Sequence, residues 1–426
     1  MKIRIFRHNL VAPPPKVHKG LRTIDFAFSS LGDVLNDRLH YLQILRAFGA
    51  LFVLLAHIGG LEVRTHEAAN TSGVIIDSVF LKNLGVASVQ MFFVLSGFIM
   101  SVVSARAKPS VANSANYLLG RFFRVMPVWW LFLLLYCGAL FINFGVPWNP
   151  LFLRADVSGW DALIKSFFLI PYEQIPILPV GWSLVHEQYF YIAFAFILLV
   201  PFRFHLIALA LWALVPISSL LMGVRLFDAH TIIDLIVHPL TFEYIAGAAL
   251  GWLFAKNVRP VPGLVFAAGV ISFLAVSALS PIPFMGSPII YRVSLILLPC
   301  ALLVYGAAGL AMSERFSGII KLLSRFGDYS YSLYLCHPIV ILIAPKIMTT
   351  TANLGEAVLN LTPGQLDFLR LGSAGYFDNI IYIVGVFIGA NVISAMAYHW
   401  FETPIIRWYK SRSKRRPEKK STLAAE

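Results

Sequence analysis

Apolar residues occur in long runs separated by short polar segments, and each run is close to the length that crosses a bilayer. The runs cover residues 42–60, 83–104, 126–146, 183–201, 205–222, 232–254, 261–280, 289–311, 328–345 and 379–401. This pattern predicts an all-α, polytopic membrane helix bundle of about ten transmembrane helices. The expected division is a basic tail over 1–41, a transmembrane domain over 42–408 and a second basic tail over 409–426.

Composition agrees with a membrane protein, because 58% of the 426 residues are hydrophobic and only 13% are charged. Soluble domains carry about twice that share of charge. The three cysteines are odd in number and lie in apolar runs, so they predict neither a disulfide framework nor a metal site. They are Cys137, Cys300 and Cys336.

The Lys and Arg residues that give the net charge of +13 are unevenly divided between the two sides of the predicted membrane domain. With the N-terminus inside, the inside segments hold 25 Lys and Arg and the outside loops hold 8. This bias predicts that both termini are cytoplasmic. The basic tails are therefore expected to meet lipid headgroups, and no nucleic-acid partner is expected. In the first tail, apolar residues at helical spacing within 24–35 predict a short amphipathic helix on the membrane surface.

The first apolar run carries two ionisable residues, Arg46 and His57. Eleven residues of α-helix bring them within about 20° on one face and roughly 16 Å apart along the axis. An ionisable side chain inside a membrane helix is costly, so a functional role is the first hypothesis. The alternative is an Arg that reaches the interface and a packed polar His.

Two further arginines follow the second run in the sequence RFFRVMP. Arg121 and Arg124 are neighbours on a helix surface and are expected at the same depth as Arg46. Three guanidinium groups would form a phosphate-binding site through forked hydrogen bonds. The alternative is anchoring of a cytoplasmic loop by positive charge.

The fourth run opens with GWSLVHEQYFY, and the ninth contains DYSYSLYLCHP. Glu187 is expected at about the same depth as His57, which favours an acid–base or orienting pair. The alternative is an interfacial aromatic belt with a solvated Glu187. In the ninth run, only His337 points to more than structural hydrogen bonding.

Two features of other runs also yield predictions. Asp234, His238 and Glu243, together with His337, would form a proton relay if the protein were a proton-coupled transporter. Two G-x-x-x-G pairs, at 247–251 and 385–389, predict close helix packing.

The combination of Arg46-x10-His57, FFVLSGF, RFFRVMP, GWSLVHEQYFY, GDYSYSLYLCHP and FETP resembles the membrane-bound acyltransferase family 3 over residues 40–408. The segments around Gln43, GWS and GDYSYS are similar to the branch that acts on bacterial exopolysaccharides. The resemblance implies transfer of an acyl group, commonly acetyl from cytoplasmic acetyl-CoA, to a hydroxyl of a glycan or lipid-linked sugar. Gln90 departs from the family pattern, in which many members carry an acidic residue.

The resulting prediction is an O-acyltransferase of the bacterial inner membrane, with a proton-coupled transporter or a non-catalytic scaffold as alternatives. Arg46, Arg121 and Arg124 would bind acyl-CoA, which is a donor substrate and not a permanently bound cofactor. His57 would act as general base or carry the acyl group, with Glu187 beside it. The predicted substrate-binding or supporting residues are Trp182, Ser183, Tyr331 and His337. The other expected partners are a glycan acceptor, membrane lipids and polysaccharide export machinery.

Overall fold

The computed structural model describes residues 40–414 except 77, 224–228, 259, 281–282, 285, 311–316 and 374. The described part is helical throughout and contains no strand, which confirms the all-α prediction. The predicted amphipathic helix within 24–35 lies outside the described residues. The helices are α2 (His40–Ala69), α3 (Val79–Ser104), α4 (Val111–Phe144), α5 (Gly159–Phe168), α6 (Gly181–Ile197), α7 (His205–Leu221), α8 (Ile232–Val237), α9 (Thr241–Ala255), α10 (Pro262–Leu279), α11 (Ile289–Gly309), α12 (Ser317–Asp328), α13 (Ser330–Val358), α14 (Phe377–Ala397) and α15 (Thr403–Lys414), with short turns η1 (Phe202–Phe204), η3 (Asp367–Leu369) and the π-helical η4 (Tyr398–Glu402).

Within the described residues, eight helical stretches are long and apolar enough to cross a membrane. They comprise α2, α3, α4, η1 with α7, α10, α11, α13, and α14 continued into α15. The other two predicted spans are shorter, because α6 has 17 residues and the run 232–254 is broken into α8 and α9. The break falls at His238, which is extended (φ −69°, ψ 134°) because Pro239 follows it. The chain is a multi-pass membrane protein.

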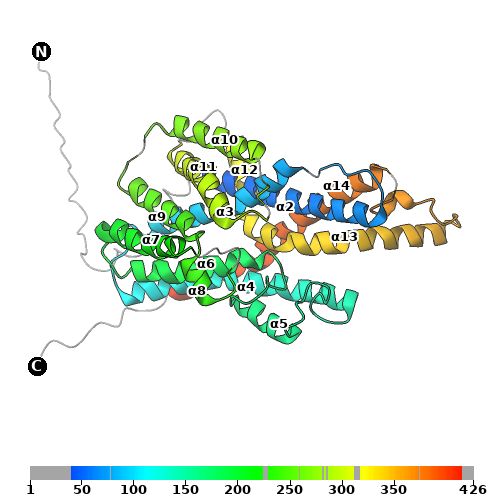
Figure 1. Cartoon of the computed structure of the whole chain (residues 1–426), viewed down its shortest axis with the longest axis horizontal. Helices are drawn as coiled ribbons and strands as arrows, with labels where there is room; N and C mark the ends of the chain where they lie inside the picture. The colour runs from blue at the N-terminus through cyan, green and yellow to red at the C-terminus, as the bar shows by residue number, and fades with distance from the viewer. Residues whose placement is uncertain are drawn as a thin grey trace, which may run out of the picture.

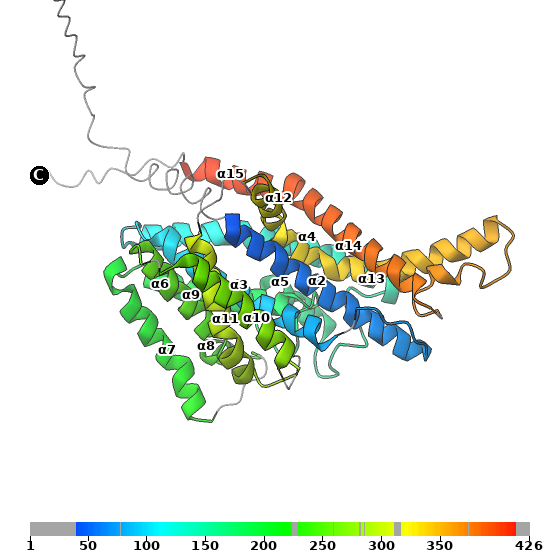
Figure 2. The same ribbon diagram turned by 90° about the horizontal axis from the view of Figure 1, so that it is seen from above.

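The helices pack as an elongated bundle (Figures 1 and 2). Helix α3 packs extensively against α9, and α2 packs against α3 and α12. Helices α10 and α11 form a second pair beside α3. Helices α13 and α14 run side by side, and the end of α13 with the chain that follows it extends beyond the rest of the bundle (Figures 1 and 2).

The crossing of α3 and α9 depends on glycine. A Cβ at Gly247 would overlap the carbonyl oxygen of Val94, and a Cβ at Gly97 would overlap that of Tyr244. The first G-x-x-x-G prediction is therefore confirmed. The second is wrong, because a Cβ at Gly385 would meet nothing within 4 Å and one at Gly389 would make only ordinary contact.

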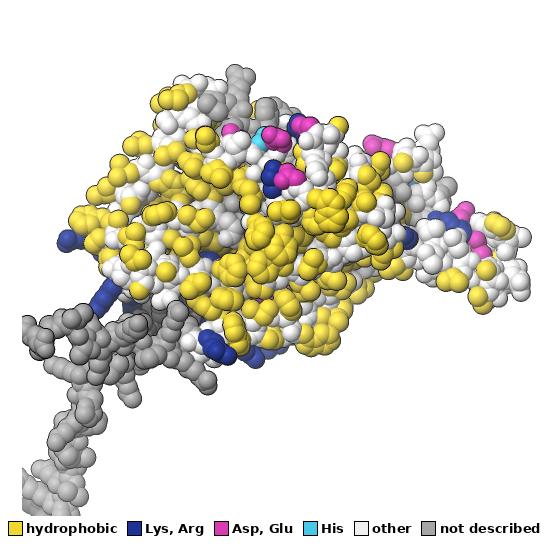
Figure 3. Space-filling model, turned by 90° about the horizontal axis from the view of Figure 1, so that it is seen from below, with side chains coloured by type: hydrophobic (Ala, Val, Ile, Leu, Met, Phe, Trp, Pro, Cys, Tyr) yellow, Lys and Arg dark blue, Asp and Glu magenta, His cyan; other side chains and the backbone are white. Residues whose placement is uncertain are grey.

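Much of the surface is apolar, as a bilayer-facing surface requires. Figure 3 shows a broad band of hydrophobic side chains, with Lys and Arg along one edge and acidic side chains together with Lys and Arg near the opposite edge. Two examples of exposed apolar side chains are Leu211 on α7, which is 61% exposed, and Ile388 on α14, which is 56% exposed.

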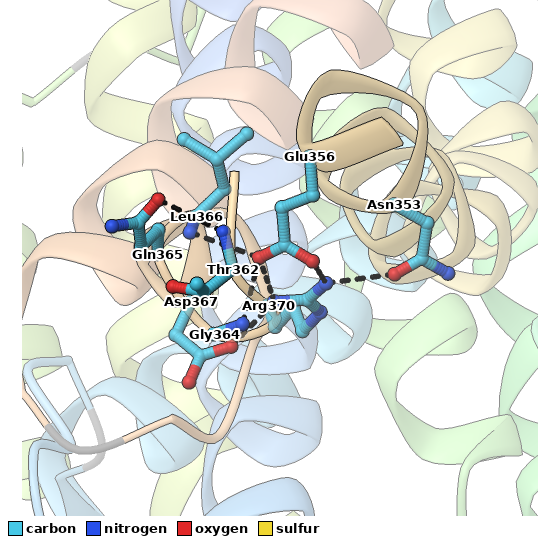
Figure 4. Close-up of polar contacts among 8 residues, drawn as sticks. All are labelled: Asn353, Glu356, Thr362, Gly364, Gln365, Leu366, Asp367 and Arg370. Carbon is cyan, nitrogen blue, oxygen red and sulfur yellow. Dashed lines mark hydrogen bonds and ion pairs between the residues drawn. The ribbon is translucent and has the colours of Figure 1, made fainter. Parts of the chain in front are cut away.

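A polar cluster closes the projecting end of α13 and the chain that follows it (Figure 4). Glu356 accepts hydrogen bonds from the backbone N–H groups of Gly364 (2.9 Å) and Leu366 (3.0 Å). Arg370 bonds both carboxylate oxygens of Glu356 and also pairs with Asp367. These two carboxylates raise the pKa of Arg370, so the loop is fixed by ionised groups at neutral pH.

Candidate functional site

His57 lies on the packed face of α2 and is nevertheless accessible. Ala50 and Val53, which are both 1% exposed, lie within about 40° of it around the helix axis. The His57 side chain itself is exposed. Its Nδ1 lies 2.8 Å from the carbonyl oxygen of Val53. Because a carbonyl only accepts, Nδ1 carries the proton, and in the neutral ring Nε2 keeps its lone pair for a substrate.

A second histidine faces the first from α13. The ring centroids of His57 and His337 lie 4.9 Å apart, with 57° between the ring planes. His337 is fully buried, and its Nδ1 bonds the carbonyl oxygen of Leu333 at 3.1 Å. Its Nε2 has no hydrogen-bond partner among the described residues. The structure therefore brings two of the predicted residues together, each with Nε2 unprotonated when its ring is neutral.

The three predicted arginines lie on α2 and α4, and they share a network of charges. Arg46 interacts electrostatically with Arg124, by repulsion, and with Glu402, Glu187 and Asp328, by attraction. Three carboxylates therefore accompany the arginines; the sequence allows such a pairing for Glu402 in FETP but did not place Glu187 or Asp328 there.

The guanidinium of Arg121 lies 5.6 Å from the ring centroids of both Tyr117 and Tyr191. Within the described part of the chain, neither Arg121 nor Arg124 donates a side-chain hydrogen bond. Arg46 donates one, from Nη1 to Gln43 at 3.1 Å. The donors of these guanidinium groups are thus available to a ligand, while the aromatic rings hold Arg121 in place.

Glu187 lies with the arginines rather than with the histidines. Its Oε1 accepts hydrogen bonds from Ser96 (3.1 Å) and from Tyr191 (2.5 Å), whose ring contacts Arg121. No contact joins Glu187 to His57 among the residues that the structure describes. The catalytic role of Glu187 stays a prediction, but the expected direct pairing with His57 does not form.

The depth argument for that pairing failed because α2 is longer than predicted. It continues past Gly60 to Ala69, so His57 lies inside the helix and not at its outer end. Buried polar groups hold the extension. Glu62 accepts hydrogen bonds from the N–H groups of Ile75 and Ile76, and His66 bonds Asn379 at 2.7 Å.

The four predicted supporting residues make contacts around the two histidines and between helices α13, α4 and α6. Ser183 bonds the hydroxyl of Tyr334 at 2.8 Å, and the Tyr334 ring lies 6.0 Å from that of His337. Tyr331 donates to the carbonyl oxygen of Val125 at 3.0 Å, which joins α13 to α4. Trp182 packs edge-on against Phe93 and His186.

Sequence reasoning did not select Ser96, Tyr334 or Glu402 as candidate site residues. Tyr334 could have been found, because it precedes His337 by three residues on the same helix. Glu402 is 2% exposed and accepts a hydrogen bond from Ser332 at 2.8 Å. Seventy positions separate these two in the sequence, and no periodicity links them.

The residues of the transporter alternative do not form one relay. Asp234 completes the N-terminal cap of α8 with Thr231, and His337 belongs to the His57 pair. His238 and Glu243 both interact electrostatically with Arg292. The geometry thus distributes these groups over separate environments.

The structure thus combines helices long enough to cross a membrane, a histidine with an unprotonated Nε2 and arginines with available donors, a combination that suits an integral-membrane group-transfer protein. The sequence profile of the acyltransferase 3 family, described as an acyltransferase domain, matches residues 39–399. The chain belongs to this family and is an acyltransferase.

Two curated proteins are similar to the chain. The exopolysaccharide production protein ExoZ of Rhizobium meliloti (strain 1021) is 28% identical over 278 residues, which cover 62% of this chain and 78% of that protein. The acyltransferase MdmB of Streptomyces mycarofaciens is 25% identical over 375 residues, which cover 82% and 90%. No solved structure matches the chain significantly.

Proposed function

We propose that the protein is an inner-membrane O-acyltransferase that moves an acyl group, in the first place acetyl, from cytoplasmic acyl-CoA to a hydroxyl of an exported glycan. The observation that carries this proposal is the available Nε2 of His57 on the same face of α2 as Arg46. The two residues are roughly 16 Å apart along the helix. An extended acyl donor lying along α2 would reach from one to the other.

The phosphates of CoA would bind Arg46, Arg121 and Arg124. Planar guanidinium groups suit phosphate oxygens, and the unused donors of Arg121 and Arg124 support this assignment. Glu187 would act as a positioning residue here, because Tyr191 connects it to Arg121. Its charge would also keep the arginines from repelling one another when the donor is absent.

The reaction follows from the His57 tautomer. Nε2 of His57 removes the proton of the acceptor hydroxyl while the oxygen attacks the thioester carbonyl. The carbon–sulfur bond then breaks, and the CoA thiolate takes up the proton. In the alternative route Nε2 attacks the thioester first and the CoA thiolate leaves. The acceptor hydroxyl then attacks the acyl-histidine, the acyl–nitrogen bond breaks to release Nε2, and the hydroxyl proton passes to the thiolate. His337 and Tyr334 would fix the imidazole in both routes.

The acceptor class is inferred from a relative. ExoZ is named for exopolysaccharide production, and the Ser183 and Tyr331 segments belong to the motifs that resemble the exopolysaccharide branch. A glycan assembled for export would meet the enzyme at the membrane, together with lipids and export machinery. The charge bias supports an orientation in which the arginines face the cytoplasm, where acyl-CoA is made.

The test uses protein in lipid nanodiscs with radiolabelled acetyl-CoA and the glycan fraction of cells that lack the gene. His57→Gln should abolish transfer while acetyl-CoA binding is retained, because the base is lost and the arginines remain. His399→Gln is the matched control, since His399 is exposed and lies on η4. Full transfer by a well-expressed His57→Gln protein would overturn the mechanism.

The same assay separates the two routes and the role of Glu187. Labelled protein in the absence of glycan would establish the acyl-histidine. Glu187→Gln should raise the KM for acetyl-CoA more than it lowers kcat, as expected for a donor-side positioning residue. If Glu187→Gln leaves the KM for acetyl-CoA unchanged, and if the double variant of His57 and Glu187 is no less active than His57→Gln, the two residues would instead act as one catalytic unit.

A further inference from the structure

A cavity of about 210 Å³ lies between the 170–176 segment, the start of α6 and the chain before α8. Its wall combines aromatic, carboxylate, amide and imidazole side chains. The polar and aromatic members are Tyr172, Glu173, Gln174, Trp182, His186 and His230. Neither Lys nor Arg is among the residues that line it.

One wall of the cavity contains an unpaired buried polar group. His186 is 4% exposed, and its Nδ1 has no hydrogen-bond partner among the described residues. Behind it lies His238, with 4.5 Å between the ring centroids, and the Nε2 of His238 is likewise unpaired. A buried polar atom without a partner costs about 1–3 kcal/mol, and two such imidazole nitrogens make the region directly behind this wall polar.

The opposite wall is rigid. The hydroxyl of Tyr172 donates to the carbonyl oxygen of Ile175 at 3.0 Å and bonds Ser166 at 3.2 Å. Trp129 and Trp130 on α4 donate to the carbonyl oxygens of Ser166 and Phe167. The 170–176 segment is therefore held against α5, and α5 is held against α4.

The inner wall is joined to the proposed catalytic pair by consecutive contacts. Trp182 precedes Ser183, which bonds Tyr334. Tyr334 contacts His337, and His337 contacts His57. These contacts connect the cavity wall to the two histidines through Ser183 and Tyr334.

We propose that this cavity binds a sugar unit of the acceptor glycan that neighbours the unit acylated at His57. The inference rests on the proposed function and extends it to a specific acceptor subsite. The apolar face of a pyranose ring would lie on Trp182, whose Nε1 donates to no described residue. Glu173, Gln174 and His186 would bond the hydroxyls. A neutral polyhydroxylated ligand fits a wall with one carboxylate and no Lys or Arg, whereas a phosphate does not.

The kinetic test uses the nanodisc assay with the glycan fraction of the deletion strain as acceptor. Glu173→Gln and Gln174→Ala should each raise the KM for this glycan about tenfold, the effect of losing one good hydrogen bond to a ligand, and leave the KM for acetyl-CoA unchanged. Glu67→Gln is the control, because Glu67 is exposed at the end of α2 and lies outside the cavity. An unchanged glycan KM in both cavity variants would overturn the subsite.

A binding test does not depend on turnover. Glu173→Cys should react with a thiol reagent, and the glycan fraction should slow that reaction while leaving Glu67→Cys unaffected. The native cysteines are buried and give little background. Absence of protection in an enzyme that still acylates the glycan would refute the subsite alone. Absence of transfer by the unaltered enzyme would refute the proposed function, and this inference with it.

Discussion

Replacing Gly247 by Ala should destabilise the protein, although alanine is the better helix former. The new Cβ would overlap the carbonyl oxygen of Val94 and lie 2.7 Å from its carbonyl carbon. Carbon atoms in ordinary contact are about 3.5–4.0 Å apart, so α9 would have to move away from α3 by about 1 Å. Both atoms belong to backbone, and no side-chain rotation relieves the overlap.

The expected magnitude is a balance of two effects. Overpacking costs about 1–3 kcal/mol, and more where the backbone must move. Replacing Gly by Ala in a helix returns about 0.5–1 kcal/mol. Gly247→Ala should therefore be destabilised by about 1–2 kcal/mol. Gly385→Ala, in the other G-x-x-x-G pair, meets nothing within 4 Å and should be neutral or stabilised by up to about 1 kcal/mol.

Thermal unfolding of the purified variants in one detergent measures this difference. Gly247→Ala should unfold several degrees below the unaltered protein, and Gly385→Ala at the same temperature or above. Acetyl-CoA binding should also weaken in Gly247→Ala, because α3 carries Ser96, which bonds Glu187. Equal stability of the two variants would show that the α3–α9 crossing is not the tight contact described here.

Three further predictions concern topology, the donor site and the projecting loop. Ala107→Cys should resist a membrane-impermeant thiol reagent in intact cells and Ala155→Cys should react, as the charge bias requires; the reverse pattern would invert the topology. Arg121→Gln with Arg124→Gln should weaken acetyl-CoA binding by about 3–6 kcal/mol, from two charge-assisted contacts of about 1.5–3 kcal/mol each. Calorimetry measures this loss of binding free energy. Lys at both positions should restore only part of it. An unchanged affinity would show that Arg121 and Arg124 serve only to orient the loop in the membrane. Glu356→Gln should speed hydrogen exchange over 359–372 several-fold without affecting α2, because the ionised acceptor of Arg370 is lost; unchanged exchange would show that the cluster does not hold the loop.

The sequence predicts the features that depend on one helix at a time. Run length and apolar content predict ten spans, and eight of them correspond to described helical stretches that are long and apolar enough to cross a membrane. Helical spacing places Arg46 and His57 on one face. The sequence also contains the signal for the break at His238, because a proline follows it. We predicted one continuous span there because the apolar composition of the run outweighed a single proline.

Features that depend on two helices are not predictable in this way. Two identical G-x-x-x-G patterns behave differently because Gly247 and Gly251 meet the backbone of α3, whereas Gly385 and Gly389 meet no backbone of another helix. Depth counted along separate spans placed Glu187 level with His57, whereas the structure places it with Arg46 and Tyr191. Tilt, helix length and crossing point decide such pairings, and packing against neighbours sets all three.

Helix α2 connects the parts of the site because both of its ends are fixed. At its start, a Cβ at Gly327 of α12 would overlap the backbone oxygen of Gln43, so the two helices are in direct contact. At its far end, Glu62 and His66 are buried and bonded to the following loop and to α14. The helix cannot slide without breaking one of these contacts, and the helical rise keeps the spacing of Arg46 and His57 along it constant. A fixed spacing between a phosphate-binding residue and a base would select donors by the length of their acyl-carrying arm, which is constant among acyl-CoA molecules. Selection among acyl groups would then be left to the space around His57 and His337.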